Sequence, residues 1–92
     1  MSDVCFEWDE AKNEKNVAKH GIGFAQAAVV LAANRRLTFL SAQSGEERYV
    51  SIIEISGRLF AVIHLQRGQA IRIISVRRAR KSEEKQYRAL YP

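Results

Sequence analysis

From Arg36 onward, apolar and polar residues alternate with a period of two, which is typical of strands that bury one face. Four such stretches follow one another, with short turns at 43–46, 56–57 and 67–69 between them. Because short turns join antiparallel neighbours, this pattern predicts an antiparallel meander, which needs a packed partner to be stable. We predict its strands over Leu37–Ser41, Arg48–Ile55, Arg58–Leu65 and Ala70–Val76.

Three helices are expected around this meander. The first, Asp9–His20, is polar, with Asp9 as N-cap and Gly21 as the residue that ends it. The second, Phe24–Ala33, is almost entirely apolar, and its alanines favour a helix over a short buried strand. We expect it to be buried nearly all round as the cover of one sheet face. The third, Ser82–Leu90, is charged and places Glu84 and Arg88 as a helical i,i+4 pair.

The predicted order is therefore ααββββα, in a single domain over residues 1–92, because so short a chain builds only one core. We predict an α+β fold in which the helices pack on one face of an antiparallel four-stranded sheet. The other face then stays open to solvent, and we expect the functional site there.

The charge balance indicates what the protein binds. Fifteen Lys and Arg residues against ten Asp and Glu give a net charge of +5. Such a chain usually meets a nucleic acid, an anionic membrane surface or an acidic protein, and charge alone does not choose among them. The apolar run 27–33 is far shorter than the roughly 20 residues of a membrane span. We therefore expect that the protein does not bind membranes. A single cysteine, Cys5, fits a reducing compartment, so we expect a cytoplasmic protein.

Arginines at strand ends are the first candidates for phosphate binding, because guanidinium groups offer bidentate hydrogen bonds and keep their charge. Arg58 begins the third predicted strand and Arg77 follows the fourth, so we expect the two to meet at one end of the sheet. Arg48 lies nearer the opposite end, although sheet twist brings it toward the same groove. The alternative is that all three belong to a solvated basic surface.

Metal-free RNA cleavage needs a group that deprotonates the 2′-hydroxyl, one that neutralises the phosphorane, and one that protonates the leaving oxygen. His20 or Glu83 is the candidate for proton transfer, with Lys19 and the arginines for charge. Tyr87 lies one helical turn after Glu83 and offers a ring for base stacking or a hydroxyl for proton donation. The alternatives are that His20 caps a helix, and that Glu83 and Tyr87 dock the last helix on the sheet.

The sequence shows no metal-ligand spacing, because it has only two histidines and one distant cysteine. His64, in the third predicted strand, is more typical of a packed strand residue. We therefore expect no metal and no cofactor. As further RNA contacts we predict Arg72, Tyr87 and Lys12.

Two segments of the chain resemble the BrnT family of toxins from type II toxin–antitoxin systems. Between them, Glu47–Arg48 and Gly57–Leu59 stand at matching positions, so the resemblance spans residues 6–87. The first segment comprises Phe6–Asp9, Lys12, Asn16, Lys19–Ile22, Phe24 and Ala27, and the last comprises Ile71–Ala79, Glu83 and Tyr87.

The resemblance implies a fold like that of the RelE ribonucleases and an endoribonuclease that inhibits translation and growth. From the candidate residues above, we expect this endoribonuclease to be metal-independent. It also implies an antitoxin that neutralises the toxin, a BrnA-like ribbon-helix-helix protein. This antitoxin binds DNA, so the toxin itself contacts DNA only indirectly, through the antitoxin. By position, the family's basic and polar residues correspond to Lys19, His20, Arg48, Arg58, Arg77 and Glu83.

The chain departs from the family pattern at a few positions. Ile53 stands where relatives usually have glycine. Arg35–Arg36 give a positive charge to a turn that is acidic in relatives, and this change affects how an antitoxin would dock there. The alternative function is a non-catalytic module that has kept only antitoxin or nucleic-acid binding.

Overall fold

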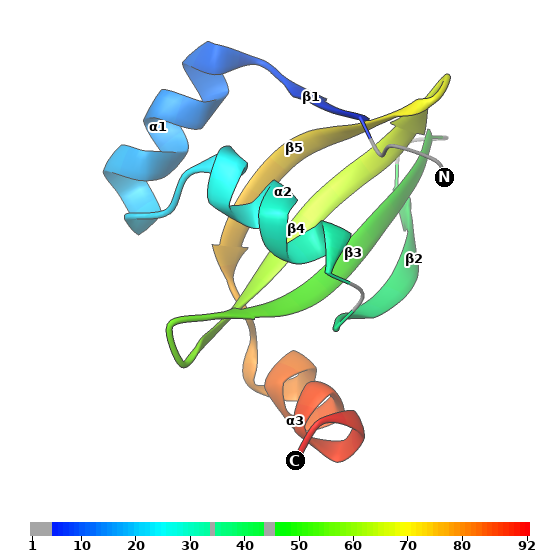
Figure 1. The fold of residues 1–92 in the computed structure, drawn as a ribbon. Helices are drawn as coiled ribbons and strands as arrows, with labels where there is room; N and C mark the ends of the chain where they lie inside the picture. The colour runs from blue at the N-terminus through cyan, green and yellow to red at the C-terminus, as the bar shows by residue number, and fades with distance from the viewer. Residues whose placement is uncertain (1–4, 34, 44–45) are drawn as a thin grey trace.

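A computed structural model of the chain describes residues 5–33, 35–43 and 46–92. Figure 1 shows a twisted sheet with α1 beside it, α2 across it and α3 after its last strand. Of the predicted turn at 43–46, residues 44–45 lie outside the described ranges. The elements are β1 (Cys5–Trp8), α1 (Glu10–His20), α2 (Phe24–Ala32), β2 (Leu37–Gln43), β3 (Glu46–Ile55), β4 (Arg58–Arg67), β5 (Ala70–Arg78) and α3 (Lys81–Leu90).

The sheet is mixed and has five strands in the order β1-β5-β4-β3-β2. The antiparallel meander of β2 to β5 is confirmed, but the predicted total of four strands is wrong, because β1 pairs in parallel with β5. Residues 5–8 are too few to show a clear alternation. Their pairing partners, residues 70–73, lie almost at the other end of the chain, so no local pattern indicates this strand.

The helices do not share one face, which corrects the sequence prediction. Phe24 and Leu31 of α2 pack on one face of the sheet, in a core that includes Ile53 and Val62. Tyr87 of α3 packs on the other face. Successive strand residues point to opposite faces, and both sets of this meander are apolar, so each face needs its own cover. The side chains packed with Tyr87 are Val50, Ile52, Leu59 and Ala61.

Helix α2 covers one face of the sheet as predicted, but the prediction that it is buried nearly all round is wrong. Its outer residue Val29 is 73% exposed, because no other element lies over that side of the helix within the described ranges. Gly23 gives α2 no side-chain cap, and Asn13 of α1 supplies one: its Oδ1 accepts a hydrogen bond from the Phe24 amide at 2.8 Å.

Helix α1 begins and ends as predicted. The Asp9 carboxylate accepts from the amides of Ala11 and Lys12, and Gly21 takes a left-handed φ of 72° after the last turn. Helix α1 lies along the edge of β5 beyond the point where β1 stops. There the buried Asn16 accepts a hydrogen bond from the Val76 amide at 3.1 Å, which would otherwise lack a strand partner.

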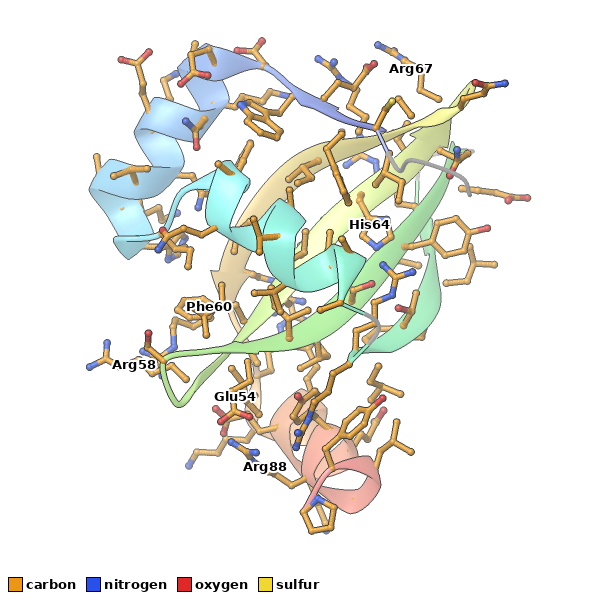
Figure 2. All side chains as sticks on the ribbon, in the orientation of Figure 1. Glu54, Arg58, Phe60, His64, Arg67 and Arg88 are labelled. Carbon is orange, nitrogen blue, oxygen red and sulfur yellow. The ribbon has the colours of Figure 1, made fainter. Side chains whose placement is uncertain are left out.

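Helix α3 is anchored by its inward face and by one outer ion pair. Arg88 pairs with Glu54 of β3, through Nη2 and Oε2 at 3.1 Å, rather than with Glu84 as predicted. Figure 2 shows Glu54 and Arg88 facing each other where β3 meets α3. Among the helices that the structure describes, none has the length and apolar character to cross a membrane.

Candidate functional site

A hollow of about 330 Å³ opens on the α3 face of the sheet. Its floor is a row of direct cross-strand neighbours, Phe39, Val50, Ile63 and Ser75, one from each of β2, β3, β4 and β5. Helix α3 packs over the adjoining part of this face, where Val50 belongs to the core around Tyr87, whereas Phe39, Ile63 and Ser75 are only partly buried. Residues far apart in the sequence therefore form one continuous surface. We call this cavity, with its rim of Ser41, Arg48, Arg77, Arg80 and Glu83, the first hollow.

The rim of the first hollow is polar and mostly basic. Register explains why Arg48 belongs to it: Arg48 lies two residues before Val50, so both point to the same face. Arg77 lies two residues after Ser75 and joins the rim for the same reason. Glu83 comes from the first turn of α3. Three guanidinium groups and a single carboxylate thus stand around a floor that is apolar except for Ser75.

Arg77 and Glu83 form a bidentate ion pair at the edge of the first hollow. Nη1 and Nη2 of Arg77 each donate to one carboxylate oxygen of Glu83 at 2.8 Å. The same carboxylate accepts from the Arg80 amide at 2.7 Å, which caps the N-terminus of α3. The Arg77 side chain remains 26% exposed, whereas that of Glu83 is 9% exposed. The pair fixes the direction of Arg77 and leaves part of its guanidinium accessible.

The charge state of this pair follows from its geometry. The hydrogen bonds from Arg77 lower the pKa of Glu83, and they outweigh the burial that would raise it. The pKa of Arg77 is raised by the same hydrogen bonds. Both groups are therefore charged at neutral pH, and Glu83 is a weaker base than an ordinary glutamate.

A second hollow, of about 510 Å³, lies between α1 and β5. It shares Ser75 and Arg77 with the first hollow, so the two lie on either side of Arg77. Its lining contains no carboxylate among the described residues. The basic groups of this second hollow are Lys12, Lys15, Lys19, His20 and Arg77, beside Asn16, Ile74, Ser75 and Val76.

Six of the predicted site residues meet around this pair of hollows. Arg48, Arg77 and Glu83 line the first hollow. Lys12, Lys19 and His20 line the second.

The structure does not bring Arg58 to the other arginines. Ala61 of β4 pairs with Arg77, and Arg58 is an odd number of residues from Ala61, so it points to the opposite face. Figure 2 shows Arg58 directed outward at the turn between β3 and β4. Arg58 is exposed and lines neither hollow.

Two predicted RNA contacts do not fit their positions. Arg72 donates to Glu7 of β1 at 2.9 Å, with its side chain 25% exposed, and it lines neither hollow. Tyr87 is fully buried between α3 and the sheet, so its ring has no exposed face on which a base can stack. The alternative interpretation of Tyr87, a residue that docks the last helix, is the one that the structure supports.

The hollows also contain four residues that were not among the predicted site residues: Ser41, Ser75, Arg80 and Lys15. Two signals were available. Ser75 is in phase with Arg77 on the same strand, and Lys15 continues a helical row of lysines with Lys12 and Lys19. Nothing in the local sequence indicates that Ser41 lies near them, because its place depends on the pairing of β2 with β3.

His64 lies on the other face of the sheet, apart from both hollows. It is 6% exposed, and its Nε2 is 2.8 Å from the Ser51 hydroxyl. Burial, and secondarily the nearby Arg36, lowers the pKa of His64 to about 4. His64 is therefore neutral at physiological pH, in agreement with its prediction as a packed strand residue.

A model of a protein family described as a ribonuclease toxin, BrnT, of a type II toxin–antitoxin system matches residues 8–83. These residues include both hollows entirely. A search of curated proteins finds no match to the chain.

Proposed function

Because the chain belongs to the BrnT family of ribonuclease toxins from type II toxin–antitoxin systems, we propose that it cleaves RNA where its two hollows meet at Arg77. The observation that carries this proposal is the position of Arg77. Its guanidinium is oriented by Glu83, partly exposed, and shared between an arginine-rimmed hollow and a lysine-lined one.

The reaction is an internal transfer at phosphorus. The 2′-hydroxyl attacks the adjacent phosphorus, the bond to the 5′-oxygen breaks, and the products are a 2′,3′-cyclic phosphate and a 5′-hydroxyl. A proton leaves the 2′-oxygen and another reaches the 5′-oxygen, so that the overall proton count is unchanged. Negative charge increases on the phosphoryl oxygens in the transition state. Oriented guanidinium groups stabilise that charge more than they stabilise the starting phosphate.

Arg77 is the residue that we assign to the phosphorane charge, with Arg48 and Arg80 beside it on the same rim. A guanidinium held in place before substrate arrives needs no reorganisation during the reaction, which is the source of its catalytic effect. The apolar floor of the first hollow offers a place for one base next to the reacting phosphate.

His20 is the candidate that we favour for proton transfer, because it lines the same hollow as Arg77 and imidazole suits this role near neutral pH. Glu83 is less suited to it. Its carboxylate already accepts two hydrogen bonds from Arg77 and one from the Arg80 amide, and its pKa is lowered. We assign Glu83 as a positioning residue for Arg77.

Metal independence is part of the proposal. Within residues 5–33, 35–43 and 46–92, no three side chains of His, Cys, Asp or Glu gather where a metal ion would be held. The positive charge that the reaction needs is available from the lysine and guanidinium groups of the two hollows, so we expect cleavage to continue in EDTA.

The direct test compares wild-type protein with Arg77→Ala and Arg77→Lys on end-labelled RNA in EDTA. We expect Arg77→Ala to lower kcat/KM by roughly 10² to 10³, the usual effect of losing one preorganised donor in a transition state. Arg77→Lys keeps the charge but loses the bidentate geometry, so it should recover only part of the rate. Thermal unfolding of each variant shows whether the fold is retained.

Arg67→Ala is the matched control, because it removes the same charge from a side chain that is 62% exposed and lines neither hollow. It should cleave at the wild-type rate. Cleavage that stops in EDTA, or an active Arg77→Ala protein, would contradict the mechanism. RNA binding without any cleavage would instead support the non-catalytic alternative.

For the partner, we propose a ribbon-helix-helix antitoxin that binds DNA, so that this chain meets DNA only through it. Support comes from the family's type II system and from the net charge of +5, which favours an acidic docking segment. Co-expression of the chain with the adjacent reading frame should restore growth and yield a co-purifying complex. We also propose that the fold is of the RelE ribonuclease type, which the α+β architecture supports.

A further inference from the structure

The lysines of α1 form a row that is longer than charge stabilisation at a single reacting phosphate requires. Lys12, Lys15 and Lys19 are three and four residues apart, so they lie on one stripe of the helix. The row is about 10 Å long at the rise of an α-helix. All three side chains are exposed and line the second hollow.

This stripe has a fixed direction relative to Arg77. Asn16 lies within the row and is buried. Its Oδ1 accepts from the Val76 amide at 3.1 Å, and its Nδ2 donates to the Ile22 carbonyl at 3.2 Å. The bond to Val76 joins α1 to β5 one residue before Arg77, and the bond to Ile22 fixes the Asn16 side chain against the loop that follows α1. The lysine row therefore leads away from the reacting centre along a rigid element.

The two hollows differ in chemistry. The first has an apolar floor and oriented guanidinium groups, which suit a base and a single phosphate. The second presents flexible ammonium groups without a carboxylate among its described lining residues. Lysines bind phosphates as point charges and do not distinguish one base from another. This row therefore suits the sugar-phosphate backbone of an RNA strand that lies along it.

Building on the proposed function, we propose that Lys12, Lys15 and Lys19 form a phosphate track for single-stranded RNA that extends to one side of the cleaved bond. The substrate is then a strand several nucleotides long, with a base in the first hollow and the flanking backbone along α1. A dinucleotide reaches Arg77 but lacks the phosphates that the track binds.

The test measures binding separately from cleavage. The double variant Lys12→Ala/Lys15→Ala is compared with Lys81→Ala/Lys85→Ala, which removes the same charge from exposed residues of α3 that line neither hollow. The probe is 2′-O-methyl RNA, which lacks the attacking hydroxyl, followed by fluorescence anisotropy from roughly 50 to 200 mM salt. Loss of two phosphate contacts should reduce the slope of log K against log salt by about 1.4. The α3 variant should keep the wild-type slope.

A second measurement uses cleavable substrates. For Lys12→Ala/Lys15→Ala, the ratio of kcat/KM for a long RNA to kcat/KM for a dinucleotide should fall roughly tenfold, because only the long substrate uses the track. For the α3 variant the ratio should stay at the wild-type value.

The outcomes separate this proposal from the proposed function. A reduced slope in a protein that cuts no RNA supports the track and contradicts the ribonuclease mechanism. Cleavage that depends on Arg77, with equal slopes in all variants, overturns the track and leaves the mechanism standing. Equal losses in the α1 and α3 variants also overturn it, because net charge alone then explains binding. An unchanged slope together with weakened antitoxin binding overturns it in favour of a protein contact.

Discussion

The two faces of the sheet are built from the same strands, yet they hold their polar groups in different ways. On the α2 face, Thr38, Ser51 and His64 form a chain of hydrogen bonds of 2.7 and 2.8 Å, in which the histidine is neutral. On the α3 face, Arg77 and Glu83 are both charged and border an open hollow. Ser51 and His64 are buried, and a buried group is less costly to hold neutral and hydrogen-bonded than charged. Arg77 and Glu83 keep their charges because they pair with each other at a rim next to solvent.

This difference assigns stability to one face and chemistry to the other. Helix α2 contributes Phe24, Ala27 and Leu31, each at most 1% exposed, to the larger core. Helix α3 contributes Tyr87 to the smaller core, and Glu83 in its first turn lines the first hollow. Changes on the α2 face should therefore affect the free energy of unfolding, and changes on the α3 face should affect cleavage.

The largest expected effect is on the α2 face. Phe24→Ala should lower the free energy of unfolding by about 3–5 kcal/mol, because it removes a fully buried ring and leaves a cavity. Val29→Ala, on the exposed side of the same helix, should change it by less than about 0.5 kcal/mol. Urea denaturation followed by circular dichroism measures both. Similar values for the two variants would show that α2 does not anchor the core.

The next effect concerns the α3 face. Glu83→Gln removes the carboxylate that orients Arg77 and should lower kcat by roughly tenfold to a hundredfold, with little change in KM. Glu54→Gln is the matched control, since it breaks the ion pair with Arg88 on the same face but lines neither hollow. The shape of the pH–rate profile decides the role of Glu83: a profile that keeps both arms fits positioning, whereas the loss of one arm would identify Glu83 as a proton-transfer group.

An effect of up to about 3 kcal/mol should appear in the pH dependence of stability on the α2 face. The pKa of His64 is lowered from 6.5 to about 4 in the folded protein. Above pH 6.5 the imidazole is neutral in both the folded and the unfolded chain, so the free energy of unfolding carries no cost from protonation. As the pH falls from 6.5 toward 4, the unfolded chain takes up a proton that the folded chain does not, and the free energy of unfolding decreases. In His64→Gln this part of the pH dependence should disappear. An identical slope in wild type and variant would mean that His64 is protonated in the folded state.

The smallest effect is expected at Tyr87. Its hydroxyl is buried and has no hydrogen-bond partner among the described residues, so it loses hydration on folding without a replacement. Tyr87→Phe should leave the free energy of unfolding unchanged or raise it by about 1 kcal/mol, with no change in cleavage. A clear loss of stability would show that the hydroxyl is bonded in solution, for instance to a buried water.

Much of the fold follows from local patterns in the sequence. Period-two alternation identifies the four meander strands, and the caps at Asp9 and Gly21 set the ends of α1. These features are predictable because neighbouring residues determine them. The site is predictable in part for a similar reason: Arg77 and Glu83 are six residues apart, and a strand end followed by a helix start brings them together.

The meeting of the two hollows at Arg77 depends on contacts between segments that are distant in the sequence. The sequence by itself determined the elements, the excess of positive charge and the residue types able to bind phosphate. Only the tertiary structure decided which of them share a face. Pairing register places Arg48 with Arg77 and turns Arg58 away, and the bond from the Val76 amide to Asn16 brings the lysines of α1 beside Arg77. Each of these depends on contacts between distant segments, whose free energy no local pattern records.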